Sequence, residues 1–434
     1  MANNKNIKVG IGVSFKKDPY DAAVEAANKS IRECGEPTFS IVYTNADYEQ
    51  KGFLDGINSI LGKNWVGIST DKIFNSKAGY DPDIRIAVMS ISSKYMHFSV
   101  AVADNYRKNP KKNAFLAVKS AVENIHADKY IDAYIQFIRT KKKDYGSIIR
   151  NPPYFVLTYI SGVKILNGKT TPGYETEFIS GILEYTGPHI PIFGGSASSS
   201  LEEYVKNKAD NFQFADGKLY HNAAIVVFAI CNLHFTNLVE HGYKLTKDFA
   251  TITKVDKSGY EILEINGKEP IEEYARLLGV SKKEYLRGPS NYSFSRPFSV
   301  VTEDGTTIIK EAIPNPDNKT LHANFKLYPN AIVNITNIDK KETLETCKLS
   351  IDNMLKDKKG KKPAIAMFCS CSGRRPLAKN LEKIDLHNLR KKYPNLPFFG
   401  FYSFSEVGST KTLSAQSHSQ TVTSLIIFDE LLSS

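Results

Sequence analysis

The feature that most constrains the fold is an alternation of apolar strands and amphipathic helices near both ends of the chain. At the start, apolar residues 7–14 precede a helix that opens at Asp18 and Pro19, and further strand–helix steps follow. The order returns at the end, with strands at 331–336, 363–370, 397–401 and 421–428 and helices at 342–356 and 377–391. It predicts an α/β (mixed α+β) fold of two related domains, each a β-sheet backed by helices. The recurrence is compatible with an internal pseudo-duplication.

A chain of 434 residues is long enough for two or three domains. We expect a first domain over residues 1–240 and a second over 241–434. The second begins with a hairpin whose turns are Ser258–Gly259 and Asn266–Gly267. Residues 281–316 are rich in turn formers and predict an irregular connecting segment.

Three apolar strands run into a glycine and then into short hydroxylated residues. They are WVGISTD (65–71), IPIFGGSASSS (190–200) and LPFFGFYSFSEVGS (396–409). Glycine lets the backbone turn or approach another group closely, and short hydroxyls satisfy open backbone groups. If the strand ends converge at a cleft between the domains, they face a small ligand; the alternative is that they are ordinary turns.

The loop FCSCSGRRP (368–376) places two cysteines, a glycine and two arginines at a strand end. We expect a helix to begin here, so that its N-terminus, Arg374 and Arg375 attract a carboxylate or phosphate. Nearby cations would also stabilise a Cys371 thiolate. The structural alternative is a buried cysteine, with Arg374 bound to a carbonyl or to an acid such as Glu406.

Several motifs together resemble the FIST family, a sensory module with an N-terminal and a C-terminal part. The N-terminal resemblance lies in VGIST, in IPIFGGSAS and in the long stretch 241–279. The sequence departs from the family pattern at Ser405, where a glycine is usual, and in the GGSASSS loop, which lacks an acidic residue. The C-terminal resemblance is carried by Cys371, Gly373, Arg374, Gly400, Phe401, Tyr402, Ser405, Glu406, His418 and Thr421.

The resemblance implies a stand-alone sensory protein in signal transduction, with a FIST N-like domain over 1–240 and a FIST C-like domain over 241–434. It also implies a small ligand, an amino acid or another carboxylate, in a cleft between the domains, and a signalling protein as partner. The residues that we expect to bind the ligand are Ser69, Thr70, Gly194, Gly195, Ser196, Cys371, Gly373, Arg374, Glu406, His418 and Thr421.

Two other functions stay open. A cysteine-dependent, hydrolase-like enzyme would use Cys371 as nucleophile and would need His418 or another base within hydrogen-bond reach.

Some relatives of the family are haem-based nitric-oxide sensors, and His234 in CNLHF is the candidate axial ligand. We expect neither turnover nor haem. We expect no metal site, since Cys369 and Cys371 lack the partners that zinc requires.

Charge and composition bear on partners and location. The formal net charge is +11, but most of the 57 basic residues are lysines without interleaved aromatics, so we expect no nucleic acid. No apolar run reaches membrane-spanning length, and the N-terminus does not resemble a secretory signal, so we expect a soluble protein. Five scattered cysteines favour reduced thiols and a cytoplasmic location.

Overall fold

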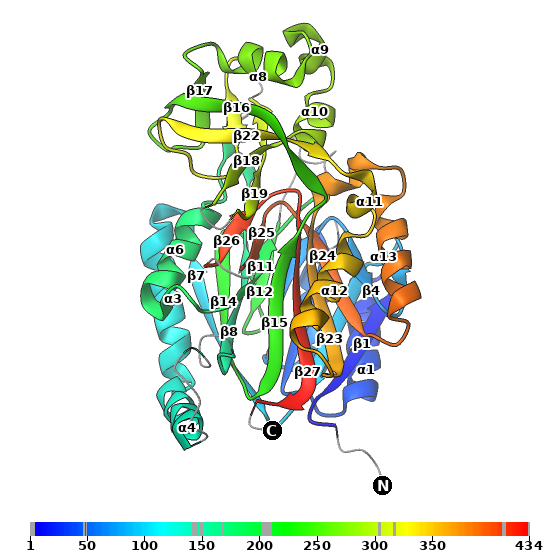
Figure 1. Ribbon diagram of the computed structural model, residues 1–434. Helices are drawn as coiled ribbons and strands as arrows, with labels where there is room; N and C mark the ends of the chain where they lie inside the picture. The colour runs from blue at the N-terminus through cyan, green and yellow to red at the C-terminus, as the bar shows by residue number, and fades with distance from the viewer. Residues whose placement is uncertain are drawn as a thin grey trace.

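The computed structural model describes residues 5–46, 48, 50–140, 146, 151–166, 169–200, 211–302, 305–315, 318–409 and 414–432. Within these residues, three six-stranded sheets form a large body and a seven-stranded sheet forms a smaller part above it (Figure 1). This is the mixed α/β fold with two domains that the sequence predicts. Both chain ends lie at the side of the body that is far from the seven-stranded sheet (Figure 1).

The first sheet and its two helices contain the N-terminal alternation. Gly10 and Gly12 let helix α1 pack against strand β1, because a Cβ atom on either would lie 1.8 Å from a carbonyl oxygen of α1. Asp18 caps the helix by accepting a hydrogen bond from the Asp21 amide. In order, the strands are β1 (Lys8–Ser14), β6 (Ile86–Ser92), β2 (Phe39–Asn45), β3 (Trp65–Thr70), β12 (Gln213–Ala215) and β13 (Lys218–Tyr220), with α1 (Pro19–Cys34) and α2 (Gln50–Leu61).

The second sheet joins strands from distant parts of the chain. Its apolar residues pack against helices α3 (Pro110–Asn124) and α6 (Glu175–Thr186). Its strands are β26 (Gln416–His418), β25 (Glu406–Gly408), β11 (Ile192–Ser196), β8 (Tyr154–Ile160), β14 (Ala223–Cys231) and β7 (Met96–Asp104).

The third sheet is mixed in the same way and packs against α12 (Thr346–Asp357) and α13 (Leu381–Lys392). Its strands are β15 (Leu233–Glu240), β27 (Val422–Leu431), β23 (Pro363–Cys371), β24 (Phe398–Ser403), β4 (Ile73–Asn75) and β5 (Gly79–Tyr80). Strands from both sides of residue 240 therefore share two sheets. The boundary that we expect there divides the sequence but not the sheets.

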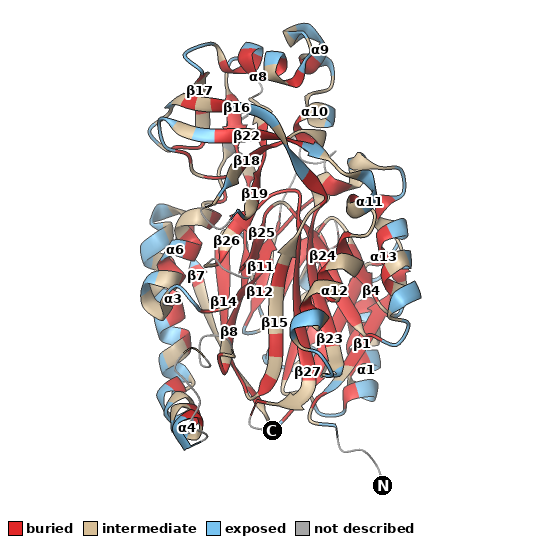
Figure 2. Ribbon diagram, viewed as in Figure 1, coloured by how far each residue is buried: buried red, intermediate tan, exposed pale blue. Residues whose placement is uncertain are grey.

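The main core lies where the three six-stranded sheets meet. Tyr43 of the first sheet stacks on Phe399 of the third, with ring centroids 4.5 Å apart. The Tyr43 hydroxyl also lies 3.2 Å from that of Tyr159 in the second sheet. Figure 2 shows these strands largely buried, with most exposed residues on the surrounding helices. The ends of β3, β11 and β24 therefore lie in a tightly packed interior.

The seven-stranded sheet corrects one prediction. Residues 281–316 are not an irregular link, because they contain helices α9 (Lys282–Arg287) and α10 (Pro289–Ser295) and strands β18, β19 and β20. Each element is short, so its hydrophobic period is too brief to recognise among turn residues. The strands are β19 (Thr307–Lys310), β18 (Phe298–Val301), β22 (Ala331–Ile338), β16 (Tyr243–Val255), β17 (Glu261–Ile265), β21 (Leu321–Ala323) and β20 (Ala312–Pro314), with α8 (Pro270–Leu278) beside them.

Two predicted helices also differ. The helix expected over 342–356 is divided into α11 (Lys340–Thr343) and α12, and the one expected from residue 377 is preceded by a 3₁₀ turn, η2 (Ser372–Leu377). Pro376 within η2 has no backbone N–H to donate to the carbonyl four residues earlier, so residues 372–377 cannot continue as an α-helix through this proline. The remaining described elements are η1 (Tyr106–Lys108), α4 (Ala127–Thr140), β9 (Lys164–Leu166) and β10 (Lys169–Thr171).

Candidate functional site: a cavity beside the turn after strand β23

Strand β23 ends at Cys371 and continues directly into the 3₁₀ turn η2. Gly373 lies close to Gln420: a Cβ atom there would lie 2.1 Å from Nε2, so a larger residue would displace the Gln420 amide. The turn therefore packs tightly against the start of β27. No α-helix N-terminus lies at Arg374, since α13 begins only at Leu381, so the expected anion site at a helix start is wrong.

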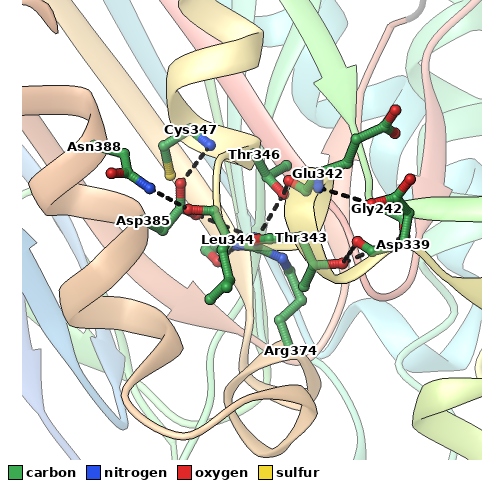
Figure 3. A network of polar contacts seen from close by, with 11 residues as sticks. Gly242, Asp339, Glu342, Thr343, Leu344, Thr346, Cys347, Arg374, Asp385 and Asn388 are labelled. Carbon is green, nitrogen blue, oxygen red and sulfur yellow. Dashed lines mark hydrogen bonds and ion pairs between the residues drawn. The ribbon is translucent and has the colours of Figure 1, made fainter.

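Arg374 serves the fold rather than a ligand. Its guanidinium is buried and donates to Ser370 Oγ at 2.9 Å, to the Thr343 carbonyl at 3.0 Å and to Asp385 Oδ2 at 3.1 Å. Asp385 also accepts from the Cys347 amide at 2.9 Å (Figure 3). These contacts tie η2 to α11, α12 and α13. Arg374 does not line the cavity described below, so its assignment to the ligand is corrected.

Arg375 points toward the N-terminal part of the chain. It forms an ion pair with Asp71, in the loop after β3, and donates to the Tyr80 hydroxyl at 3.4 Å. Its guanidinium also lies 5.7 Å from the ring centroid of Tyr402. Among the described residues, Arg375 Nε has no hydrogen-bond partner. Arg375 is thus mostly, but not fully, satisfied by the protein.

A cavity of about 620 Å³ lies beside this turn. One wall is formed by η2 and the start of α13, and the opposite wall by α10, by β20 with the preceding Glu311, and by Asn324 after β21. The lining residues are Asp71, Val163, Ser290, Phe294, Glu311, Ile313, Asn324, Cys371, Ser372, Gly373, Arg375, Pro376, Ala378, Lys379, Asn380, Glu382 and Phe404. Of the residues predicted from sequence, Cys371 and Gly373 are among them.

Glu311 is the buried acid of this cavity, and it lies outside the residues predicted from sequence. Its side chain is 6% exposed, and Oε2 accepts a hydrogen bond of 2.6 Å from Gln420 Nε2. Burial raises the pKa of Glu311 to about 7. The available signal was a single acid between the apolar residues of IIKEAI, in the segment interpreted as irregular.

Glu406 lies in the interior and not at the cavity. Ser403 Oγ donates to it at 2.6 Å, and the Thr421 amide and hydroxyl donate at 3.2 and 3.0 Å. Burial raises the pKa of Glu406 to about 8, against the effect of these donors. Glu406 and Thr421 bind each other, and neither lines the cavity.

His418 faces Glu406 in the β25–β26 register, but its Nε2 lies 3.2 Å from the Gly408 carbonyl. Burial is the main cause that lowers the pKa of His418 to about 3, so the imidazole is neutral. His418 does not line the cavity either. The sheet brings Glu406 and His418 together, but their side chains bind other partners.

The three glycine-terminated strands do converge, yet they pack against one another. Gly195 pairs with Glu406 across β11 and β25, and a Cβ atom on Gly195 would lie 2.4 Å from Cys369 Sγ. Gly194 has φ +154° and lies against the Thr158 carbonyl, where a Cβ atom would come within 1.9 Å. Close packing, rather than a ligand, explains both glycines.

The hydroxyl groups at these strand ends form hydrogen bonds within the protein. Thr70 donates to the Tyr402 carbonyl at 2.6 Å, and Ser69 accepts from the Phe212 amide at 2.7 Å. Ser196 donates to the buried Glu175 at 2.5 Å. The residues Ser69, Thr70, Gly194, Gly195 and Ser196 do not line the cavity that contains Cys371.

The surroundings of Cys371 do not favour the expected thiolate. Burial raises the pKa of this thiol well above its usual value, and Glu406 and Glu311 raise it further. Asp385 neutralises the positive charge of Arg374, and Asp71 neutralises that of Arg375. A protonated thiol beside two carboxyl groups is a poor nucleophile.

The surroundings of His234 bear on the haem alternative. His234 lies on β15 and lines neither the 620 Å³ cavity nor a smaller one of about 230 Å³ beside α13. An axial ligand must face a cavity that accepts the macrocycle, and His234 faces neither of these two cavities. In the described part of the chain, no group of three or more His, Cys, Asp or Glu residues is arranged to hold a metal ion.

Two family models match nearly the whole chain. The FIST N domain matches residues 38–268, and the FIST C domain matches residues 270–409. The chain belongs to the FIST family. FIST domains are small-ligand-binding sensory domains of signal transduction. The cavity is lined from both matched parts, with Asp71 and Val163 in the FIST N match and η2 in the FIST C match.

The other comparisons add little to the FIST assignment. No curated protein matches the chain. Among solved structures, "Structure of PurLQS from Thermotoga maritima" aligns with 97% of this chain and 72% of that chain at 8% identity. Its TM-score is 0.22, so this likeness carries no argument. No helix in the described residues combines the length and the apolar character needed to cross a membrane.

Proposed function

We propose that this FIST protein is a sensor that binds its small ligand in the cavity between η2 and α10. The observation that carries the proposal is the cavity itself. Its volume of about 620 Å³ lies within the usual range for small-molecule sites, about 300–1,000 Å³. Apolar residues such as Phe294, Ile313 and Phe404 line it together with a few polar groups, which is typical of such sites.

The position of the cavity supports a role in signalling. Its walls come from the seven-stranded sheet and from the large body, so a ligand would contact both. A ligand that binds one relative arrangement more tightly than another shifts the population toward it. A signalling protein that recognises the favoured arrangement would then read out the ligand. We also propose a cytoplasmic location, supported by five free cysteines.

An amino acid or another carboxylate is a candidate ligand, with Arg375 as the group that would bind the carboxylate. Arg375 keeps one unpaired guanidinium nitrogen but already pairs with Asp71. A carboxylate would therefore have to share Arg375 with Asp71. We derive no enzymatic function, because the Cys371 thiol is protonated and buried.

The test is a thermal-shift screen of small metabolites with two matched variants. Ser290→Trp places an indole in the cavity, whereas Asn291→Trp, the next residue of α10, is exposed and lies outside the lining. We expect at least one compound to stabilise the wild type and Asn291→Trp but not Ser290→Trp. A ligand at 100 times its Kd stabilises a protein by about 2.7 kcal/mol, which is readily seen as a shift in Tm.

Ala378→Leu fills the cavity from the opposite wall and replaces Ser290→Trp if that variant does not fold. Stabilisation that persists in the filled variants would place the binding site elsewhere. A broad screen without any stabilising compound would contradict the proposed sensor.

A further inference from the structure

We infer that the group by which the ligand is recognised is a protonated amine, and that Glu311 is the residue that binds it. The inference rests on the proposed function, since it names the chemical class of ligand for the same cavity. It goes beyond that proposal because it assigns specificity to a residue outside every family motif in the sequence.

The charges around the cavity favour a cationic ligand. Both arginines of the turn are neutralised, Arg374 by Asp385 and Arg375 by Asp71. Among the other lining residues, Lys379 is exposed, while Glu311 and Glu382 are acidic. The interior of the cavity therefore has more acid than free base. Such a surface favours a cation over an anion.

Glu311 has no basic partner in the described part of the chain. Its neighbour Lys310 is buried and donates to the Ser417 carbonyl at 2.9 Å instead. Gln420 Nε2 donates a hydrogen bond to Oε2 of Glu311, and no described residue donates a hydrogen bond to Oε1 of Glu311. A buried carboxyl group with one uncommitted oxygen in a cavity needs a donor, and an ammonium group supplies up to three.

The Glu311 carboxyl group is held in position by Gln420. Gln420 is fully buried and has a left-handed backbone, φ +58°, which is uncommon for a residue with a side chain. Its Oε1 lies 3.3 Å from the Tyr243 hydroxyl, which also donates to the Phe294 carbonyl at 2.6 Å, while its Nε2 donates to Glu311. Strained backbone of this kind is often found at functional sites. The result is a preorganised acceptor.

The protonation state of Glu311 depends on whether a cation is bound. The titratable groups that Glu311 influences are Cys371, Tyr243, Tyr274 and Tyr285, and burial raises the pKa of each. They are uncharged near neutral pH and do not compete for the ligand's charge. Burial raises the pKa of Glu311 to about 7, so much of it is neutral when the cavity holds no cation. Binding of R–NH₃⁺ favours the carboxylate, and the Glu311 proton passes to solvent.

The rest of the cavity fits the organic part of such a ligand. Phe294 and Phe404 line it, and aromatic faces attract ammonium groups while apolar surface accepts a hydrocarbon body. The ligand class is therefore a small organic amine with an apolar or aromatic substituent. A carboxylate on the ligand is not required.

The experiment extends the thermal-shift screen with Glu311→Gln. A neutral Gln has the shape of protonated Glu and keeps an oxygen for Gln420, so the fold should be preserved; circular dichroism and Tm check this. Compounds whose effect is lost in Ser290→Trp should be amines. Glu311→Gln should weaken their binding at least tenfold in calorimetric titrations, and Glu311→Asp should restore part of it.

Matched probes separate the amine from the rest of the molecule. We would compare 2-phenylethylamine with 2-phenylethanol and 3-phenylpropanoate, and include phenylalanine. The amine should bind at least tenfold more tightly than the alcohol and the carboxylate, and at pH 6 it should release close to one proton, measured from the heat in buffers of different ionisation enthalpy. At pH 8 the proton release should be much smaller.

The outcomes distinguish this inference from the proposed function. Hits that are lost in Ser290→Trp but are neutral molecules or carboxylates would overturn the amine and leave the sensor standing. The same holds for amines whose affinity is unchanged in Glu311→Gln. A screen without any cavity-dependent hit would overturn both.

Discussion

Arg374 Nη2 lies 3.1 Å from Asp385 Oδ2, and both side chains are almost entirely buried. The pair joins the turn η2 to helix α13, and the Thr343 carbonyl extends the contact to α11 (Figure 3). A residue that the sequence assigns to a ligand is thus part of the scaffold that shapes one wall of the cavity. Removing one member of such a pair leaves an uncompensated buried charge.

We therefore expect Arg374→Ala to lower the free energy of unfolding by about 3–5 kcal/mol. Lys111→Ala is a suitable control, because Lys111 pairs with Glu184 at the surface and both side chains are about half exposed. That variant should lose less than about 1 kcal/mol. Urea denaturation measures both values, and equal losses would contradict the structural role of Arg374.

The cysteines provide a second prediction. All five are buried and free, and the pKa of Cys371 is raised by burial and by Glu406 and Glu311. Iodoacetamide at pH 7.5 should label the folded protein much more slowly than the urea-unfolded protein, at every cysteine. Mass spectrometry of tryptic peptides measures labelling site by site. Rapid labelling of Cys371 alone in the folded protein would support a Cys371 thiolate and the enzymatic alternative.

Glu406 predicts a pH dependence of stability. Burial raises the pKa of Glu406 to about 8, whereas the unfolded chain titrates near 4.5. Between these values the folded protein holds a proton that the unfolded chain has lost, so this contribution to stability is complete below pH 4.5 and is lost as the pH rises toward 8. Glu406→Gln removes the effect. Its free energy of unfolding relative to wild type should rise by about 2–4 kcal/mol from pH 5 to pH 8, since each pH unit contributes up to about 1.4 kcal/mol.

Glu273→Gln is the control for Glu406→Gln. Hydrogen bonding to Arg276 is the main cause that lowers the pKa of Glu273 to about 2, so Glu273 is ionised in both states from pH 5 to 8. The difference in unfolding free energy between Glu273→Gln and wild type should be constant over this range. A constant difference for Glu406→Gln as well would show that Glu406 is ionised in the folded protein.

The haem alternative has a direct test. His234 faces neither cavity, so haemin added to the purified protein should give no Soret band that depends on this residue. Spectra of the wild type and of His234→Ala after gel filtration should be alike. A sharp Soret band in the wild type that is lost in His234→Ala would support a haem sensor.

Local pattern was sufficient for the main strands and helices and for the family. Residues 7–14, 38–44 and 65–69 have apolar character that identifies a strand without knowledge of its partners, and the glycines mark real close contacts. Pairing was not predictable in the same way. β4, a strand of three residues, is stable because it joins β24, more than three hundred positions away. No local signal indicates such a contact.

The site was harder to predict for the same reason. Cys371 and Gly373 do line the cavity, but the direction of Arg374 depends on Asp385, which faces it from a helix that starts later than expected. Glu311 lies after a strand of four residues in a turn-rich segment. Its importance comes from burial and from Gln420, both of which depend on tertiary packing.

A crystal structure of the protein with a compound whose stabilising effect is lost in Ser290→Trp tests the central claim most directly. The account predicts ligand density in the cavity between η2 and α10, with a nitrogen atom about 3 Å from a carboxyl oxygen of Glu311. Ligand density anywhere else, with this cavity holding only water, would contradict it.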